Sequence, residues 1–135
     1  MLNITVEHEQ LDKPVAVINL EGELDHQNYE DVITKARELR DTGVVRLVLN
    51  LADLSYMGSS GIFALRSIAV IVGGNEPPDP DSGWGAVKEQ GVPAEEPGAV
   101  KLLNPQPQVE RVLDRSGLKP WFPIFTDRAE ALAAF

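Results

Sequence analysis

The chain has 135 residues, of which 12 are Lys or Arg and 21 are Asp or Glu, so its formal net charge is -9. Typical domains run roughly 100–200 residues, and we therefore expect one domain over residues 1–135. The negative charge repels phosphate backbones and anionic lipid, which excludes nucleic acid and membrane surfaces as partners. The chain has no cysteine, which excludes disulfides, thiolate nucleophiles and cysteine-bearing metal sites. No apolar run approaches the length of a membrane helix, and the acidic start lacks a basic signal segment, so we expect a cytoplasmic protein.

The first part of the chain predicts an antiparallel hairpin. Apolar and polar residues alternate over residues 2–7, which is the period of a strand with one face on a core. Residues 15–20 form a second apolar, β-branched run, and a polar stretch joins it to the first. The sequence GELD at residues 22–25 is expected to break this second strand.

A helix and a central strand follow. Over residues 26–40 the apolar positions recur at helical spacing, which predicts an amphipathic helix that Gly43 ends. The run VVRLVLNL at residues 44–51 has few polar interruptions. It predicts a central strand that is covered on both faces.

The next segment is typical of a turn followed by a helix. DLSYMGSSG occupies residues 53–61, and residues 62–72 are apolar on nearly every side. This pattern predicts a second helix that packs on the sheet. Ser59 or Ser60 can supply the side-chain oxygen that caps the start of this helix.

Residues 73–98 differ in kind from the rest of the chain. They hold more than half of the 11 glycines and half of the 10 prolines, so we expect a disordered acidic insert here rather than a core element. Deletion of residues 75–97 is expected to leave the fold intact, because long surface loops carry little of the stability. Beyond the insert, the pattern predicts a strand over residues 100–103, a short helix over 109–113 ended by Gly117, an edge strand over 122–125, and a helix over 127–135 with Thr126 as its N-cap.

Strands that alternate with helices after an initial hairpin predict an α/β fold with a mixed sheet. Within that pattern, three segments resemble the STAS domain family of anti-sigma factor antagonists: GELD, the strand VRLVLNL, and DLSYMGSSGI at residues 53–62. The family's pattern after its central strand is D-x-S-x-x-D-S-S-G. The resemblance implies a STAS-type mixed β-sheet of about four to five strands packed against about four helices.

The resemblance also implies a partner switch. In such a switch the unphosphorylated antagonist binds an anti-sigma factor that is also a serine kinase of the GHKL type, and this frees the sigma factor. Phosphorylation of a serine ends the binding, and whether a phosphatase resets the switch is left open. By position, the phospho-acceptor is Ser59. The partner-binding residues that the same match implies are Asp25, Asp53, Ser55, Gly58, Ser60, Gly61 and Ile62.

Gly58 departs from the family pattern, which usually has aspartate directly before the acceptor serine. A contact made by that carboxylate is missing here, and glycine also loosens the backbone because it admits positive φ. Two interpretations follow. Either the kinase has adapted to glycine, or the protein is an antagonist that acts without phosphorylation.

The residues also support the site without the resemblance. Ser59 lies where a strand ends and a helix begins, so a phosphate there would face the free N–H groups and the positive dipole end of that helix. The simpler interpretation is that Ser59 and its neighbour only cap the helix. For Asp53 and Ser55 the simpler interpretation is turn chemistry, in which short polar side chains bond their own backbone. Ile62 and Phe63 are most simply core residues, although either could anchor a partner.

An enzyme is not expected. GSSG at residues 58–61 is one residue too short for the G-x-S-x-G of a serine hydrolase, and surface positions explain both His8 and His26. The sequence has no zinc-binding spacing and no phosphate-binding GK[ST] motif, so we expect no metal and no cofactor. The alternative function is a structural STAS scaffold subunit of a signalling or transport complex without an active phospho-switch. A large self-assembly would favour the scaffold, and a monomer or weak homodimer would favour the antagonist.

Overall fold

The computed structural model describes residues 2–11, 13–72, 99–118 and 122–135. The insert expected over residues 73–98 lies outside the described residues. The expectations about its order and its deletion therefore stay predictions.

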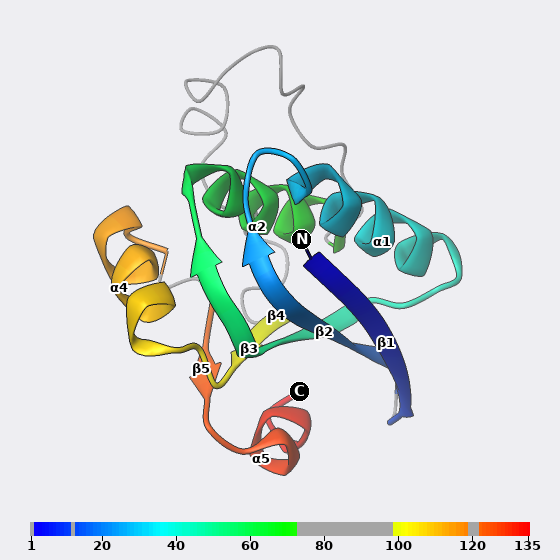
Figure 1. Ribbon diagram of the computed structural model, residues 1–135. Coiled ribbons are helices and arrows are strands. Elements are labelled where there is room, and N and C mark those ends of the chain that lie inside the picture. Colours follow the sequence, from blue (N-terminus) through cyan, green and yellow to red (C-terminus); the bar gives the residue numbers. More distant parts are fainter. Residues whose placement is uncertain (1, 12, 73–98, 119–121) are drawn as a thin grey trace.

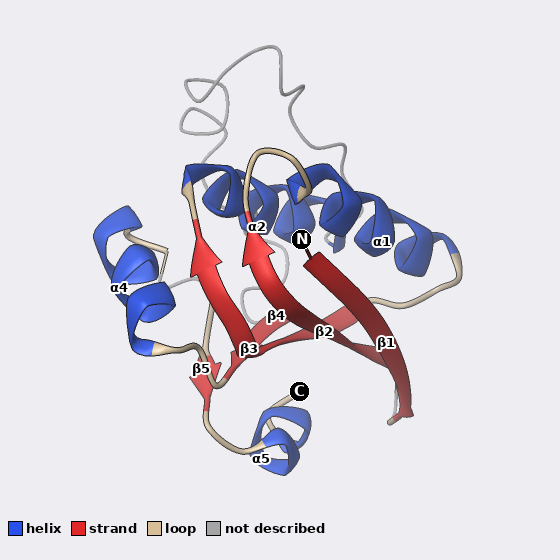
Figure 2. Cartoon of the chain, in the orientation of Figure 1, coloured by secondary structure: helices blue, strands red, loops and turns tan. Residues whose placement is uncertain are grey.

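The described residues form a mixed five-stranded sheet, in the order β1-β2-β3-β4-β5, with four helices (Figure 1, Figure 2). The first two strands pair antiparallel and every other neighbouring pair is parallel, which confirms the predicted α/β fold. The strands are β1 (Leu2–Gln10), β2 (Pro14–Leu24), β3 (Arg46–Met57), β4 (Val100–Leu103) and β5 (Ile124–Phe125). The helices are α1 (Tyr29–Asp41), α2 (Ser59–Val72), α4 (Pro107–Ser116) and α5 (Arg128–Ala133).

Helices α1 and α2 lie on one face of the sheet (Figure 2). The central strands turn alternate apolar side chains toward them, because side chains of a strand repeat with a period of two. Tyr29 of α1 meets Phe63 of α2 edge to face, with ring centroids 5.9 Å apart. The main core therefore lies on this face, and its buried members include Ala16, Ile18, Leu20, Leu47, Leu49, Leu51, Leu65 and Ile68, with Val109 and Leu113 from α4.

Helix α5 lies on the opposite face (Figure 1). It closes a smaller apolar cluster of Val17, Val48, Leu103 and Ala131. The ring of Phe135 adds cation–π contacts, since its centroid is 4.0 Å from Lys101 Nζ and 5.7 Å from Arg46 Cζ. Strand β3 is thus buried on both faces, as its sequence predicts.

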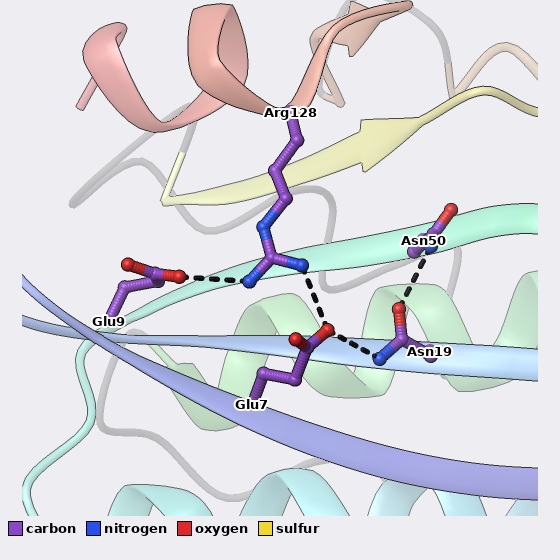
Figure 3. Close-up of polar contacts among 5 residues, drawn as sticks. All are labelled: Glu7, Glu9, Asn19, Asn50 and Arg128. Carbon is purple, nitrogen blue, oxygen red and sulfur yellow. Dashed lines mark hydrogen bonds and ion pairs between the residues drawn. The ribbon is translucent and has the colours of Figure 1, made fainter.

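Polar side chains tie the start of α5 to the N-terminal hairpin (Figure 3). Arg128 donates to Glu7 at 2.8 Å and to Glu9 at 2.9 Å. Asn19 donates to the same Glu7 carboxylate at 2.9 Å and accepts from Asn50 at 2.8 Å. The hydrogen bond from Asn19, followed by the hydrogen bond and charge of Arg128, holds the pKa of Glu7 below its ordinary value. The contacts therefore run from α5 across β1 and β2 to β3.

Three strands run further than the sequence suggests, and the first of them, β1, continues to Gln10 instead of ending at residue 7. Strand β2 continues to Leu24 instead of breaking at residues 22–25, because Gly22 takes a φ of 114° and the register with β3 shifts on either side of it. Strand β3 continues to Met57 instead of turning after residue 51. The longer β2 supplies the hydrogen-bond partners for this extension.

All four helix starts differ from expectation, and α2 begins at Ser59 instead of residue 62 and α4 at Pro107 instead of residue 109. Helix α1 begins at Tyr29, because residues 26–28 form a turn. The N-cap of α5 is Asp127 and not Thr126, since the Asp127 carboxylate accepts from the backbone N–H of Ala129 at 2.8 Å. Aspartate and threonine are both favoured caps, so the sequence alone does not separate the two.

Strand β3 begins at Arg46 instead of residue 44, and β5 begins at Ile124 instead of residue 122. The ends of two helices and the place of β5 are as predicted. Gly43 and Gly117 follow α1 and α4 with φ of 103° and 75°, the left-handed conformation that commonly ends a helix. Strand β5 is the last strand of the sheet order. This confirms the edge position that Pro123 suggests.

Candidate functional site

The candidate site lies where β2 and β3 end, at the same edge of the sheet (Figure 1). Leu24 of β2 pairs with Met57 of β3, and the backbone N–H of Gly58 donates to the Leu24 carbonyl oxygen at 3.1 Å. Asp25 begins the loop after β2, and Ser59 begins α2. Parallel pairing therefore brings the GELD and DLSYMGSSG segments together.

Ser59 is exposed and is the first residue of α2, whereas Ser60 is partly buried. Both serines lie inside the first turn, because the helix begins before the residue 62 that the apolar pattern suggests. Neither serine is a cap ahead of the helix, and Gly58 holds that preceding position. The first turn of α2 contains no acidic residue, so no carboxylate in that turn offsets the positive end of the helix dipole.

Gly61 lets α2 pack closely on the ends of the strands. It is buried, and a Cβ at this position would meet Cγ of Met57 and approach Cδ2 of Leu24 to 3.1 Å. Ile62 is partly buried against the main core. Phe63 lies in the interior, which confirms the interpretation of this residue as part of the core rather than as a partner anchor.

The Asp25 loop is held by its own hydrogen bonds. The Asp25 carboxylate accepts from the backbone N–H of Gln27 at 2.9 Å, and its carbonyl accepts from the N–H of Tyr29 at 3.0 Å. Asn28 accepts from the Asp25 N–H at 3.0 Å and donates to the Glu23 carbonyl at 2.8 Å. Sequence reasoning misses Asn28, although an asparagine just before a helix is a recognisable signal.

Ser55 and Asp53 differ in what they contact. The Ser55 hydroxyl donates to the Gly22 carbonyl at 3.0 Å, so it bonds the backbone of the neighbouring strand at the point where β2 changes register. Asp53 is exposed and lies opposite Glu21 in the strand pairing. The exposed carboxylates of Glu21 and Asp53 therefore lie on adjacent strands, a few residues before the strand ends that lead to the site.

Two glutamines that the sequence reasoning misses hold the last part of β3. Strand β4 pairs with β3 only as far as Asn50, so the carbonyls beyond that point lack a strand partner on this side. Gln106 donates to the Ala52 carbonyl at 2.8 Å, and Gln108 donates to the Ser55 carbonyl at 2.9 Å. These two bonds supply the missing partners and help to hold the strand that leads to Ser59.

Tyr56 adds an aromatic ring to the site. Its exposed fraction is 52%, and among the described residues only Leu11 is another exposed large hydrophobic.

Gly58 is not among the glycines with positive φ. The expectation that Gly58 loosens the backbone stays a prediction, because one φ angle does not measure how freely the backbone moves.

The site offers a surface hydroxyl on a fixed backbone at a helix N-terminus. In the part of the chain that the structure describes, no group of three or more His, Asp or Glu side chains could hold a metal ion. No helix within the same ranges has the length and apolarity to cross a membrane.

Comparisons with known proteins agree with this geometry. Residues 5–73 match the family model of the STAS domain. A relative from Lysinibacillus sphaericus, named anti-sigma F factor antagonist, is 32% identical over 120 residues, which are 88% of this chain and 85% of the relative. The solved structure of the anti-sigma factor antagonist SpoIIAA in its unphosphorylated form has a TM-score of 0.60 at 27% identity, and covers 96% of this chain and 95% of that one. The phosphorylated form of SpoIIAA from Bacillus has a TM-score of 0.55 at 25% identity, over 96% and 98% of the two chains.

These similarities extend over both motif segments, since residues 5–73 include GELD and DLSYMGSSG. The fold is the STAS fold, and the structures of SpoIIAA share it. The chain belongs to the STAS domain family of anti-sigma factor antagonists.

Proposed function

We propose that this chain binds an anti-sigma factor that is also a serine kinase, and that phosphorylation of Ser59 ends the binding. The observation that carries the proposal is the exposed position of Ser59 as the first residue of α2. A kinase can reach this hydroxyl, and a partner that covers the edge of the sheet covers it too. The names of the relatives support the partner class.

The helix start would tolerate the added phosphate. Its oxygens accept hydrogen bonds from the free N–H groups of the first turn, and its charge lies at the positive end of the dipole. The first turn has no carboxylate that would repel it. We therefore expect the phosphorylated protein to keep its fold, and one solved relative carries the phosphorylated form in its name.

The same phosphate would act against a bound partner. It adds about 1.5 to 2 negative charges, and burying such a charge without a cationic partner is unfavourable by several kcal/mol. A change of about 4 kcal/mol corresponds to a roughly thousandfold loss of affinity. The switch therefore needs a charge at the interface and no large change of conformation.

In this proposal the partner performs the chemistry and the chain itself is not an enzyme. Because the partner controls a sigma factor, we place the protein in the cytoplasm. We propose a monomer or weak homodimer, which size-exclusion chromatography with light scattering would detect. A stable large assembly would instead favour a scaffold subunit.

The test is incubation with the cognate kinase and ATP, followed by mass spectrometry and a binding titration. We expect phosphate on Ser59 of the wild type, with Ser59→Ala unmodified and still bound. Ser59→Asp should bind more weakly, and the control Ser60→Ala should still be modified at Ser59. Phosphate absent from Ser59 in the presence of an active kinase would rule out the switch. Equal affinity of the wild type, Ser59→Ala and Ser59→Asp would contradict the charge argument.

A further inference from the structure

The side chain of Tyr56 lies against Gly58, directly beside Ser59. A Cβ built on Gly58 would be 3.1 Å from the Tyr56 hydroxyl oxygen, 3.5 Å from Cε2 and 3.6 Å from Cζ. Apart from the two chain neighbours of Gly58, these are the three nearest heavy atoms to that position, and all belong to the Tyr56 side chain. The space that a side chain at position 58 would occupy is therefore bounded by the phenol end of Tyr56.

The backbone at position 58 does not itself require glycine. The described glycines with positive φ are Gly22, Gly43 and Gly117, so an L residue could adopt the Gly58 backbone without strain. At Gly61, in contrast, a Cβ would meet Met57 in the interior. Gly61 is thus a packing glycine, whereas Gly58 leaves room for a surface ring.

The ring of Tyr56 is open to a partner. Tyr56 is 52% exposed, so more than half of its surface can be covered in a complex. Tyrosine is also enriched among the residues that dominate the energy of protein interfaces, because it offers a large, rigid surface with one polar group. The ring lies against Gly58, the residue that directly precedes Ser59, so we expect it inside the area that the proposed partner covers.

We propose that Tyr56 is the specificity-determining contact of this interface, and that Gly58 positions it. The inference rests on the proposed function, because its partner is the anti-sigma factor bound over Ser59. The partner surface that fits is an apolar pocket with one group that hydrogen-bonds a phenol, in place of a cation that would pair with a carboxylate at position 58. Anti-sigma factors that need that carboxylate would then be rejected.

A double-mutant cycle with the unphosphorylated protein and its cognate anti-sigma factor tests the pair. Tyr56→Ala should weaken binding by about thirtyfold or more, as for an interface hot spot. Tyr56→Phe should weaken binding by less, because the ring remains. Gly58→Ala should weaken binding by about three- to tenfold on the Tyr56 background and leave it unchanged on the Tyr56→Ala background. The matched control is Leu11→Ala, the other exposed large hydrophobic, which lies in the β1–β2 turn and should bind as the wild type does.

Three outcomes would overturn the inference. Binding of Tyr56→Ala within about twofold of the wild type would remove the contact, and an equal effect of Gly58→Ala on both backgrounds would remove the coupling. Thermal melts that show unfolding of Tyr56→Ala would move the test to Tyr56→Phe and Tyr56→Leu, and equal affinities of these two variants would be the third outcome.

A measurement without the partner separates this inference from the proposed function. The chain has two tyrosines, so NMR signals of the Tyr56 ring can be assigned by comparison with Tyr56→Phe. Nuclear Overhauser contacts between this ring and the Gly58 Hα atoms should be present in the wild type. If the contacts are present and the wild type binds no anti-sigma factor, the proposed function fails and the inference fails with it. If the wild type binds and the contacts are absent, only the inference fails.

Discussion

The face of the sheet under α1 and α2 and the face under α5 are closed by different interactions. The first holds a large apolar core, with members such as Leu65 and Ile68 that are fully buried. The second holds a small apolar cluster, and Arg128 ties α5 to Glu7 and Glu9 at its border (Figure 3). A buried aliphatic side chain contributes about 1.5–3 kcal/mol, whereas an exposed ion pair contributes about 0–1 kcal/mol. Most of the stability therefore comes from the core under α1 and α2, whereas the contacts of the α5 face respond to charge, pH and salt.

Ile68 provides the largest test of the core under α1 and α2. Ile68→Ala removes a fully buried side chain from the larger core and should lower the free energy of unfolding by about 2–5 kcal/mol. Urea denaturation followed by circular dichroism measures this change. Thr34→Ala is the control, since Thr34 is exposed on α1 and its loss should change the free energy of unfolding by about 0.5 kcal/mol or less. If Ile68→Ala lowered the free energy of unfolding by less than about 1 kcal/mol, the assignment of Ile68 to the main core would be contradicted.

Gly58 and Gly61 flank the serine pair, and substitutions there compare a surface position with an interior one. Gly61→Ala places a methyl group against Met57 in the interior and should lower the free energy of unfolding by about 1–3 kcal/mol. Gly58→Ala adds the same methyl group at the surface, where only the flexible end of Tyr56 must move, and should change it by about 0.5 kcal/mol or less. Equal losses in urea melts of the two variants would show that Gly61 is not a packing glycine.

Arg128 tests the other face. Arg128→Ala breaks both ion pairs to β1, but these groups are partly exposed, so the expected loss is about 1 kcal/mol or less. The loss should shrink at high salt, because salt screens exposed charges. Arg111→Ala, an exposed arginine of α4, is the control for removing one positive charge. A loss from Arg128→Ala as large as that from Ile68→Ala would erase the distinction between the faces.

The smallest expected effect is a pH dependence at Glu7. Its folded-state pKa is lowered, mainly by the Asn19 hydrogen bond and then by Arg128. Its contribution to stability is therefore complete above the unfolded-state pKa and is lost as pH falls through the folded-state pKa. Glu7→Gln should flatten the decline of Tm on the acid side, whereas Glu21→Gln, at an exposed position of β2, should keep the slope of the wild type. Identical acid-side slopes in all three proteins would show that the tie does not act through Glu7.

The sequence predicts the strands and helices of this fold because buried apolar residues recur with the period of a strand or of a helix. The alternation over residues 2–7 and the apolar run at 44–51 both appear as strands of the kind expected. The ends of β2 and β3 are not predictable in the same way, because each strand continues only where the other pairs with it. A glycine such as Gly22 looks the same in a turn and in a strand that changes register.

The candidate site also combines features that the local sequence predicts with features that only the folded structure shows. A serine between a strand and a helix can be recognised locally, and Ser59 has the exposed position that the switch requires. The bonds from Gln106 and Gln108 to β3 join residues 54 and 53 positions apart, so no local pattern reveals them. Likewise, the fit of Tyr56 beside Gly58 depends on side-chain direction, which spacing in the sequence does not show.

The proposal that a charge at Ser59 controls the partner is tested by measuring the dissociation constant of the anti-sigma factor for the chain with and without phosphate on Ser59. Isothermal titration of the two purified forms measures both values, and circular dichroism shows whether both are folded. We predict a roughly thousandfold weaker complex for the phosphorylated form, with the fold unchanged. Equal dissociation constants for the two folded forms would contradict the claim that a charge at Ser59 controls the partner.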